Sequence, residues 1–181
     1  MRLAEQSAKI SRGNPVHHPH HGIGQVQAVG KRTFAGSGGA NFAQLYFKRE
    51  ELTLILPMRD AAHAVRSPIS AAQAAQILDH IGNWDGRANK QWKARAAAHQ
   101  EAMDRDDPFE CAEVFKALSR LEAAGSLRHT DRAHLNRALT ALADELSFAL
   151  DESLDRVREQ ITAAAAVPGT DPDPSRSADP E

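Results

Sequence analysis

The chain has 181 residues, which is enough for one ordinary domain or two small ones. With 41% hydrophobic and 25% charged residues and few aromatics, its composition is typical of a soluble globular protein. The net charge of −2 excludes a global basic field, so any contact with nucleic acid must come from a local patch. A single cysteine, Cys111, excludes an internal disulfide framework and a thiolate metal cage.

Neither end of the chain suggests targeting to a membrane. The N-terminal sequence lacks the apolar core of a signal peptide, and no run approaches the roughly 20 apolar residues of a membrane span. We therefore expect a cytoplasmic protein with no membrane partner. We also expect a flexible N-terminus over residues 1–12 and a disordered tail over residues 167–181, which are rich in Pro, Asp and Ser.

Residues 13–66 have the pattern of a small β domain. Three β-prone runs, "GIGQVQAV", "NFAQLYFKR" and "ELTLILP", are separated by turn signals that include the glycine-rich "AGSGGAN". Runs of this length with position alternation predict a small antiparallel sheet or barrel. The domain would end near residue 66, where the pattern changes.

Four histidines in "PVHHPHHGIGQV" (15–26) raise the question of a metal site. Zinc needs three or four converging ligands, and neighbouring histidines on a strand point to opposite faces. At most two of the four share a direction, so we predict no metal site there. Pro19, Gly22 and Gly24 indicate a tight strand-turn-strand instead. Because catalytic and phosphate-loop motifs are also missing from the sequence, we expect neither an enzyme nor a bound cofactor.

Residues 67–166 have a helical pattern. Ser70 is expected to cap a helix over 71–81, and a second helix is expected from about Asn89 to residue 103. Asp107 before Pro108 predicts the start of a third helix that ends at residue 125. Thr130 is expected to cap a fourth helix over 131–150, and a fifth covers 152–166. The predicted fold class is therefore α+β, with a β domain followed by an all-α domain.

One helical segment differs from the rest in charge. Residues 86–100 contain no acidic residue, and Trp92 lies at their centre among four cations: Arg87, Lys90, Lys93 and Arg95. Cations can bind a phosphate backbone, and an apolar side chain among them can insert into a minor groove. Alternatively, Trp92 is a core residue, although its helical neighbours at three and four positions would form a poor aromatic pocket. These residues alone leave the two interpretations equal.

Several motifs together resemble the CarD/CdnL family of bacterial transcription regulators, over about residues 13–161. The family signature Gly-Asp-x-Val-x-x-Pro-x-His-Gly-x-Gly is similar to "GNPVHHPHHGIG", with Asn14 in place of the aspartate. "LTLILP" resembles the strand that closes the N-terminal module. The family's tryptophan, basic run, spacer and Ala-Glu-Val are similar to "WKARAAAHQEAMDRDDPFECAEVFKAL". "LRHTDRAHL" resembles a Leu-Ser-x-x-Glu helix start, with Arg128 for the serine and Asp131 for the glutamate.

The resemblance implies a Tudor-like N-terminal barrel that binds the β subunit of RNA polymerase, and a helical module that contacts promoter DNA at the upstream edge of the transcription bubble. Trp92 would take the wedge role in the minor groove, and Arg95 matches a basic DNA-contacting position. Lys93, which we also expect at the DNA, is basic where relatives often have a small polar residue. Arg32 matches a polymerase-facing arginine, and Ile55 stands where some relatives carry a second one. We expect a monomeric, non-enzymatic transcription regulator.

The sequence departs from the family in its charge. Alanines occupy three positions after the tryptophan where relatives often carry Arg, Tyr or Lys, and Arg87 and Lys90 supply charge ahead of it instead. Each missing phosphate contact lowers the salt dependence of DNA binding. An interaction module that binds polymerase with little or no DNA contact therefore remains the alternative. The role of Trp84, in the polar "GNWDGRAN", is open between packing and a second aromatic contact.

Overall fold

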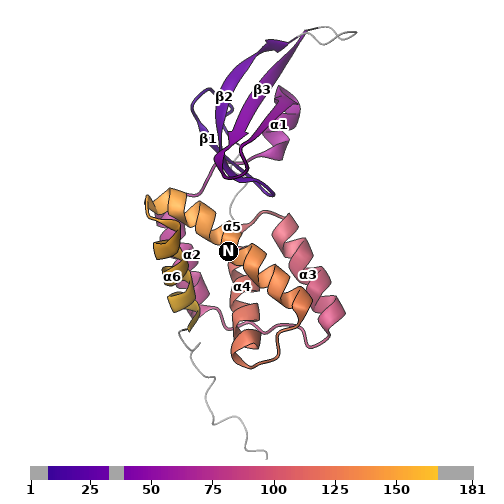
Figure 1. Cartoon of the computed structure of the whole chain (residues 1–181), viewed down its shortest axis with the longest axis vertical. Coiled ribbons are helices and arrows are strands. Elements are labelled where there is room, and N and C mark those ends of the chain that lie inside the picture. Colours follow the sequence, from indigo (N-terminus) through magenta and orange to yellow (C-terminus); the bar gives the residue numbers. More distant parts are fainter. Residues whose placement is uncertain (1–7, 33–38, 167–181) are drawn as a thin grey trace, which may run out of the picture.

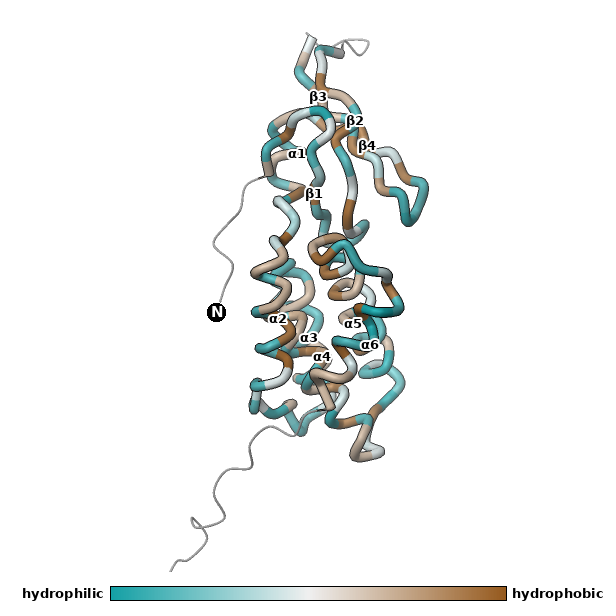
Figure 2. The backbone as a smooth tube through the Cα atoms, turned by 90° about the vertical axis from the view of Figure 1, so that its left-hand side faces the viewer, coloured by the Kyte–Doolittle hydropathy of each residue, from teal (hydrophilic) through white to brown (hydrophobic). Residues whose placement is uncertain are grey.

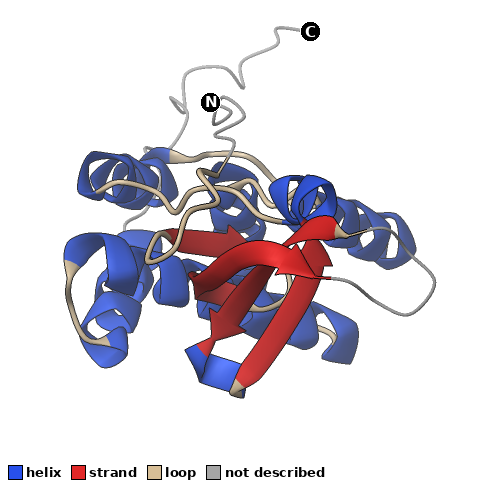
Figure 3. Cartoon of the chain, turned by 90° about the horizontal axis from the view of Figure 1, so that it is seen from above, coloured by secondary structure: helices blue, strands red, loops and turns tan. Residues whose placement is uncertain are grey.

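The computed structural model describes residues 8–32 and 39–166 and confirms the α+β class. Within these ranges an antiparallel four-stranded sheet is followed by six α-helices, and the sheet lies at one end of the molecule with the first helix beside it and the other five below it (Figure 1). Seen from above, the strands lie over the helices (Figure 3). The predicted tail over 167–181 lies outside the described residues.

The strands are β1 (Pro15–His18), β2 (Gly22–Arg32), β3 (Ala40–Phe47) and β4 (Leu52–Pro57). They pair in sequence order, each antiparallel to the next, so the three β-prone runs are confirmed as strands. The expected Tudor-like barrel is not closed, because β1 and β4 form opposite edges of the described sheet. The correct description of these strands is therefore an open sheet.

The two glycines of the histidine-rich signature have separate structural reasons. Gly22 lies in the turn between β1 and β2 with φ of +70°, a conformation that L side chains rarely adopt. Gly24 faces the ring of Phe47, and a Cβ at this position would lie 2.6 Å from the ring. The signature thus allows a tight turn and lets β2 approach the aromatic core of the sheet.

The helices are α1 (Met58–Ala64), α2 (Ala71–Asn83), α3 (Trp92–Asp104), α4 (Pro108–Ala123), α5 (His129–Leu150) and α6 (Leu154–Ala166). Two predicted caps are confirmed: the side chain of Ser70 accepts a hydrogen bond from the N–H of Gln73, and that of Asp107 accepts one from Phe109. The prediction that Thr130 caps α5 is wrong, because this helix already begins at His129. The short α1 was not predicted.

Buried apolar residues form two separate clusters. One lies between the sheet and α1 and includes Val16, Leu45 and Phe47, and the other lies among α2–α6. Hydrophobic segments accordingly occur both in the sheet and in the helical part below it (Figure 2). Residues 8–12, for which flexibility was expected, place Ala8 and Ile10 against the sheet cluster. Within the described ranges, no helix has the length and apolar character to cross a membrane.

Candidate nucleic-acid interface

Trp92 is the first residue of α3, and 41% of it is exposed to solvent. Two cations lie near its ring: Lys93 Nζ and the guanidinium carbon of Arg128 are each 5.7 Å from the ring centroid. At this separation a cation is attracted to the negative face of the ring. The exposure favours the interpretation of Trp92 as a contact residue over that of a core residue.

Arg95 lies one turn further along α3 and points into the protein. Only 5% of it is exposed, and its guanidinium forms a bidentate pair with Asp131 of α5, with Nε–Oδ1 of 3.0 Å and Nη2–Oδ2 of 2.6 Å. The hydrogen bond to Asp131 raises the pKa of Arg95, and the same bond lowers the pKa of the Asp131 carboxyl. The expectation that Arg95 faces DNA is corrected accordingly, because its charge is already paired inside the protein.

The Arg95–Asp131 pair nevertheless fixes the segment that presents Trp92. Arg95 Nη1 also donates to the carbonyl of Asn89 (2.7 Å), in the loop that leads into α3. Asp131 Oδ2 accepts a hydrogen bond from the backbone N–H of Arg128 (3.2 Å). One buried ion pair thus connects the loop before α3, the first turn of α3 and the start of α5.

The other three predicted cations of this segment, Arg87, Lys90 and Lys93, are exposed. Arg87 lines a hollow of about 470 Å³ between the 84–89 loop, α3 and α4. Of the four cations that sequence reasoning placed around Trp92, three are therefore exposed at the surface and one, Arg95, is buried.

Trp84 packs within the helical part of the protein. Its ring lies against Gly86, and the guanidinium carbon of Arg120 is 5.7 Å from the ring centroid. Arg120 also donates hydrogen bonds to the carbonyls of Trp84 and Gly86, each 2.9 Å long. Trp84 therefore anchors the loop ahead of α3 onto α4.

The two residues expected to face the polymerase belong to the sheet. Ile55 is 41% exposed on β4, an edge strand of the described sheet, where it pairs with Gln44 of β3. Arg32 ends β2 and pairs through its backbone with Ala40, while its side chain lies outside the described part. The edge strand thus presents an exposed apolar side chain.

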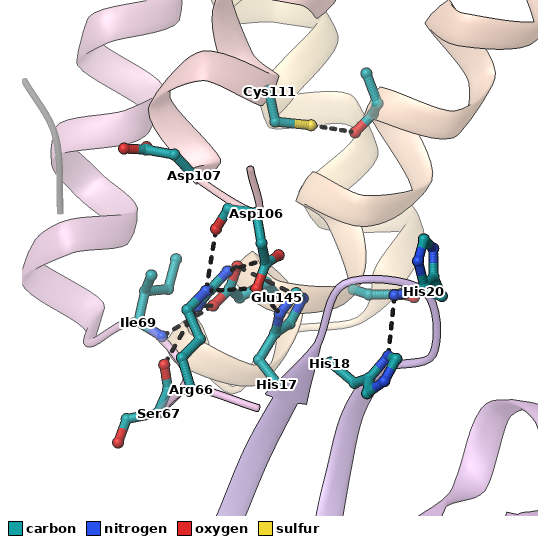
Figure 4. Close-up of polar contacts among 12 residues, drawn as sticks. His17, His18, His20, Arg66, Ser67, Ile69, Asp106, Asp107, Cys111 and Glu145 are labelled. Atoms are coloured by element: carbon teal, nitrogen blue, oxygen red, sulfur yellow. Dashed lines mark hydrogen bonds and ion pairs between the residues drawn. The ribbon is translucent and has the colours of Figure 1, made fainter. Parts of the chain in front are cut away.

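A buried polar network joins the sheet to the helices (Figure 4). Arg66 stands between the two parts, and its backbone exchanges hydrogen bonds with that of His17 on β1. Its guanidinium donates to Glu145 of α5 at 2.5 and 2.9 Å, and to Asp106, before α4, at 2.9 Å. His17 Nδ1 lies 3.2 Å from the same Asp106 carboxylate. The side chains meet between β1, α5 and the α3–α4 connection.

The electrostatics of this network favour its charged forms. Burial opposes the charge of Arg66, but the hydrogen bonds and charges of Glu145 and Asp106 outweigh burial and raise its pKa. Burial likewise opposes ionisation of Asp106, whose pKa is nevertheless lowered by His17 and Arg66. Sequence reasoning missed the network, because it considered the histidines of residues 15–26 only as metal ligands, and the partners of His17 lie far away in the chain.

One comparison with known proteins bears on these features. Residues 76–162 match the protein-family model described as CarD, C-terminal domain. The match spans most of α2 to α6, and so includes Trp92, the Arg95–Asp131 pair and Arg128. The chain thus contains a CarD C-terminal domain, which supports its membership of the CarD/CdnL family of transcription regulators.

Proposed function

We propose that the protein binds the β subunit of RNA polymerase through its sheet, and contacts promoter DNA through the Trp92 surface to modulate the stability of the open complex. The Trp92 surface is defined as Trp92 with the exposed cations Arg87, Lys90 and Lys93. This role places the protein in the cytoplasm, together with polymerase and promoter, and needs no catalytic group or cofactor.

The observation that carries the proposal is the exposure of Trp92 at the start of a fixed helix. A tryptophan that is 41% exposed, with a cation near its ring, suits a wedge between bases, while the neighbouring cations bind phosphates. Because the Arg95–Asp131 pair holds the first turn of α3, the indole is presented from a rigid element. Docking on the polymerase would raise the local concentration of this surface at the promoter, which compensates for few phosphate contacts.

The test is promoter opening followed with a fluorescent promoter and the cognate bacterial polymerase. We expect the bubble to close faster with Trp92→Ala than with wild type. Phe148→Ala is a matched control, because Phe148 is also an exposed aromatic residue. It lies near the end of α5, about 30 Å along the helix from Arg128, whose guanidinium is near the Trp92 ring. Equal closing rates for wild type and Trp92→Ala would contradict the wedge role.

A second candidate is a polymerase-binding module with little or no DNA contact. The burial of Arg95 supports it, because one more cation is withdrawn from a basic segment that is already short. Pull-down of the polymerase β subunit and a DNA mobility shift separate the two candidates. Retention of the subunit by wild-type protein, with no shifted DNA even at low salt, supports the second.

A further inference from the structure

We infer that Arg128, at the start of α5, is a further DNA-contacting residue that binds a backbone phosphate beside Trp92. The inference rests on the proposed function and deepens it, because it adds a side chain from a different helix to the Trp92 surface. Spacing along the sequence gave no reason to place the two residues together.

The contact geometry is the first support. The guanidinium carbon of Arg128 lies 5.7 Å from the centroid of the Trp92 ring, and both residues are exposed. Within residues 8–32 and 39–166, no carboxylate pairs with the Arg128 side chain, whereas nearby Arg95 and Arg132 each pair with one. A guanidinium near an aromatic face can still donate N–H groups in its own plane to phosphate oxygens.

The fixed position of Arg128 is the second support. Asp131, which is almost fully buried, holds Arg95 of α3 and also accepts the backbone N–H of Arg128. The starts of α3 and α5 are therefore tied to one carboxylate, so Trp92 and Arg128 are placed relative to each other by the fold. A phosphate bound by Arg128 would lie next to the inserted indole.

The residue type at this position is the third support. Arg128 precedes the first helical residue of α5, where Ser, Thr, Asp and Asn are preferred because their side chains accept a backbone N–H. An arginine has only donors and cannot cap the helix in this way. Since it does not serve the helix start, contact with a phosphate is the better explanation. Arg128 would also supply an exposed positive charge in place of Arg95, whose charge is buried.

The experiment measures binding to a fluorescein-labelled forked promoter duplex by anisotropy at 50–200 mM KCl. The variants are Arg128→Ser, which removes the charge while supplying a helix cap, and Arg128→Lys, which keeps the charge. We expect Arg128→Ser to lower the slope of log affinity against log salt by about 0.9, which is the loss of one phosphate contact. Its affinity deficit should then shrink about 3.5-fold between 50 and 200 mM salt.

The controls separate this inference from a general loss of charge or fold. Arg128→Lys should keep the wild-type slope, and the melting temperature of Arg128→Ser should equal or exceed that of wild type. Arg156→Ser removes an exposed arginine from α6, across the helical part from α3 (Figure 1), and should leave the slope unchanged. An equal drop in slope with Arg156→Ser would overturn the inference.

The outcome for Trp92→Ala distinguishes the inference from the proposed function. If this variant binds more weakly while Arg128→Ser matches wild type in slope, the role of Arg128 is wrong and the proposed function stands. If wild type fails to bind the fork at 50 mM salt, the DNA contact and the role of Arg128 are both wrong. If Arg128→Ser loses slope while Trp92→Ala keeps wild-type affinity at every salt concentration, Arg128 is a phosphate contact and the wedge role of Trp92 is wrong.

Discussion

At the scale of single residues, His99 shows how burial shapes the pH response. It lies on the inner side of α3, and its Nδ1 has no hydrogen-bond partner among the described residues. Burial, together with the charges of His134 and Arg95, lowers its pKa from 6.5 to about 4, while Asp131 acts in the opposite direction. The folded protein therefore favours the neutral imidazole.

The resulting prediction concerns stability between pH 6.5 and 4. The His99 imidazole binds a proton near pH 6.5 in the unfolded chain and only near pH 4 in the folded chain. Neutral His99 therefore stabilises the fold fully above pH 6.5, and this stabilisation is lost as the pH falls towards 4. Between pH 6.5 and 4 we expect the free energy of unfolding of His99→Gln, measured by urea denaturation, to fall by about 1–2 kcal/mol less than that of wild type, after allowance for solvent screening. His63→Gln, on the exposed side of α1, is the control and should keep the wild-type profile; an unchanged profile for His99→Gln would contradict the prediction.

The site could be predicted only as far as local spacing reaches. The basic segment around Trp92 was visible in the sequence, and its members Arg87, Lys90 and Lys93 are exposed in the structure. The burial of Arg95 was not visible, since it depends on Asp131 in a helix that only the fold brings alongside. The approach of Arg128 to Trp92 is a tertiary contact of the same kind. Helical periodicity describes neighbours along one element and carries no information about either.

At the scale of elements, the Arg95–Asp131 pair holds the start of α3 against the start of α5. Removing one partner of a buried ion pair leaves an unpaired buried charge, which is strongly destabilising. We expect Asp131→Asn to lower the free energy of unfolding by about 3–5 kcal/mol in urea. Replacing both partners with apolar residues of similar volume, Arg95→Met with Asp131→Leu, should recover most of this loss. A double variant no more stable than Asp131→Asn would contradict the account.

Elements with local signals were predicted well, and those without them were not. Ser70, Asp107 and Pro108 marked helix starts because capping is a short-range interaction. The α3 start was expected near Asn89 but lies at Trp92. The short α1 has no side-chain cap at its start and fully buries one residue, Ala61, in the sheet cluster. Closure of the barrel depends on pairing between the first and last strands, which alternation within a strand cannot indicate.

At the scale of the whole molecule, the network around Arg66 connects the proposed polymerase-binding sheet to the proposed DNA-contacting helices. Each part has its own hydrophobic cluster, so apolar packing alone need not couple them. Arg66 couples them directly, because its backbone pairs with β1 and its side chain binds Glu145 of α5. The orientation of Trp92 relative to the sheet therefore depends on this network.

Arg66→Ala should uncouple the two parts. The change leaves the buried carboxylate of Glu145 without its cation, which costs about 3–5 kcal/mol. In calorimetry we expect one unfolding transition for wild type and two for Arg66→Ala. Binding of the polymerase β subunit should persist, since the sheet keeps its own core. The variant should slow bubble closure less than wild type does, because Trp92 is no longer held at a fixed angle to the sheet. Arg59→Ala is the control, because Arg59 on α1 is highly exposed, and it should change neither result. A single transition together with wild-type bubble closure in Arg66→Ala would show that the two parts are coupled by other contacts.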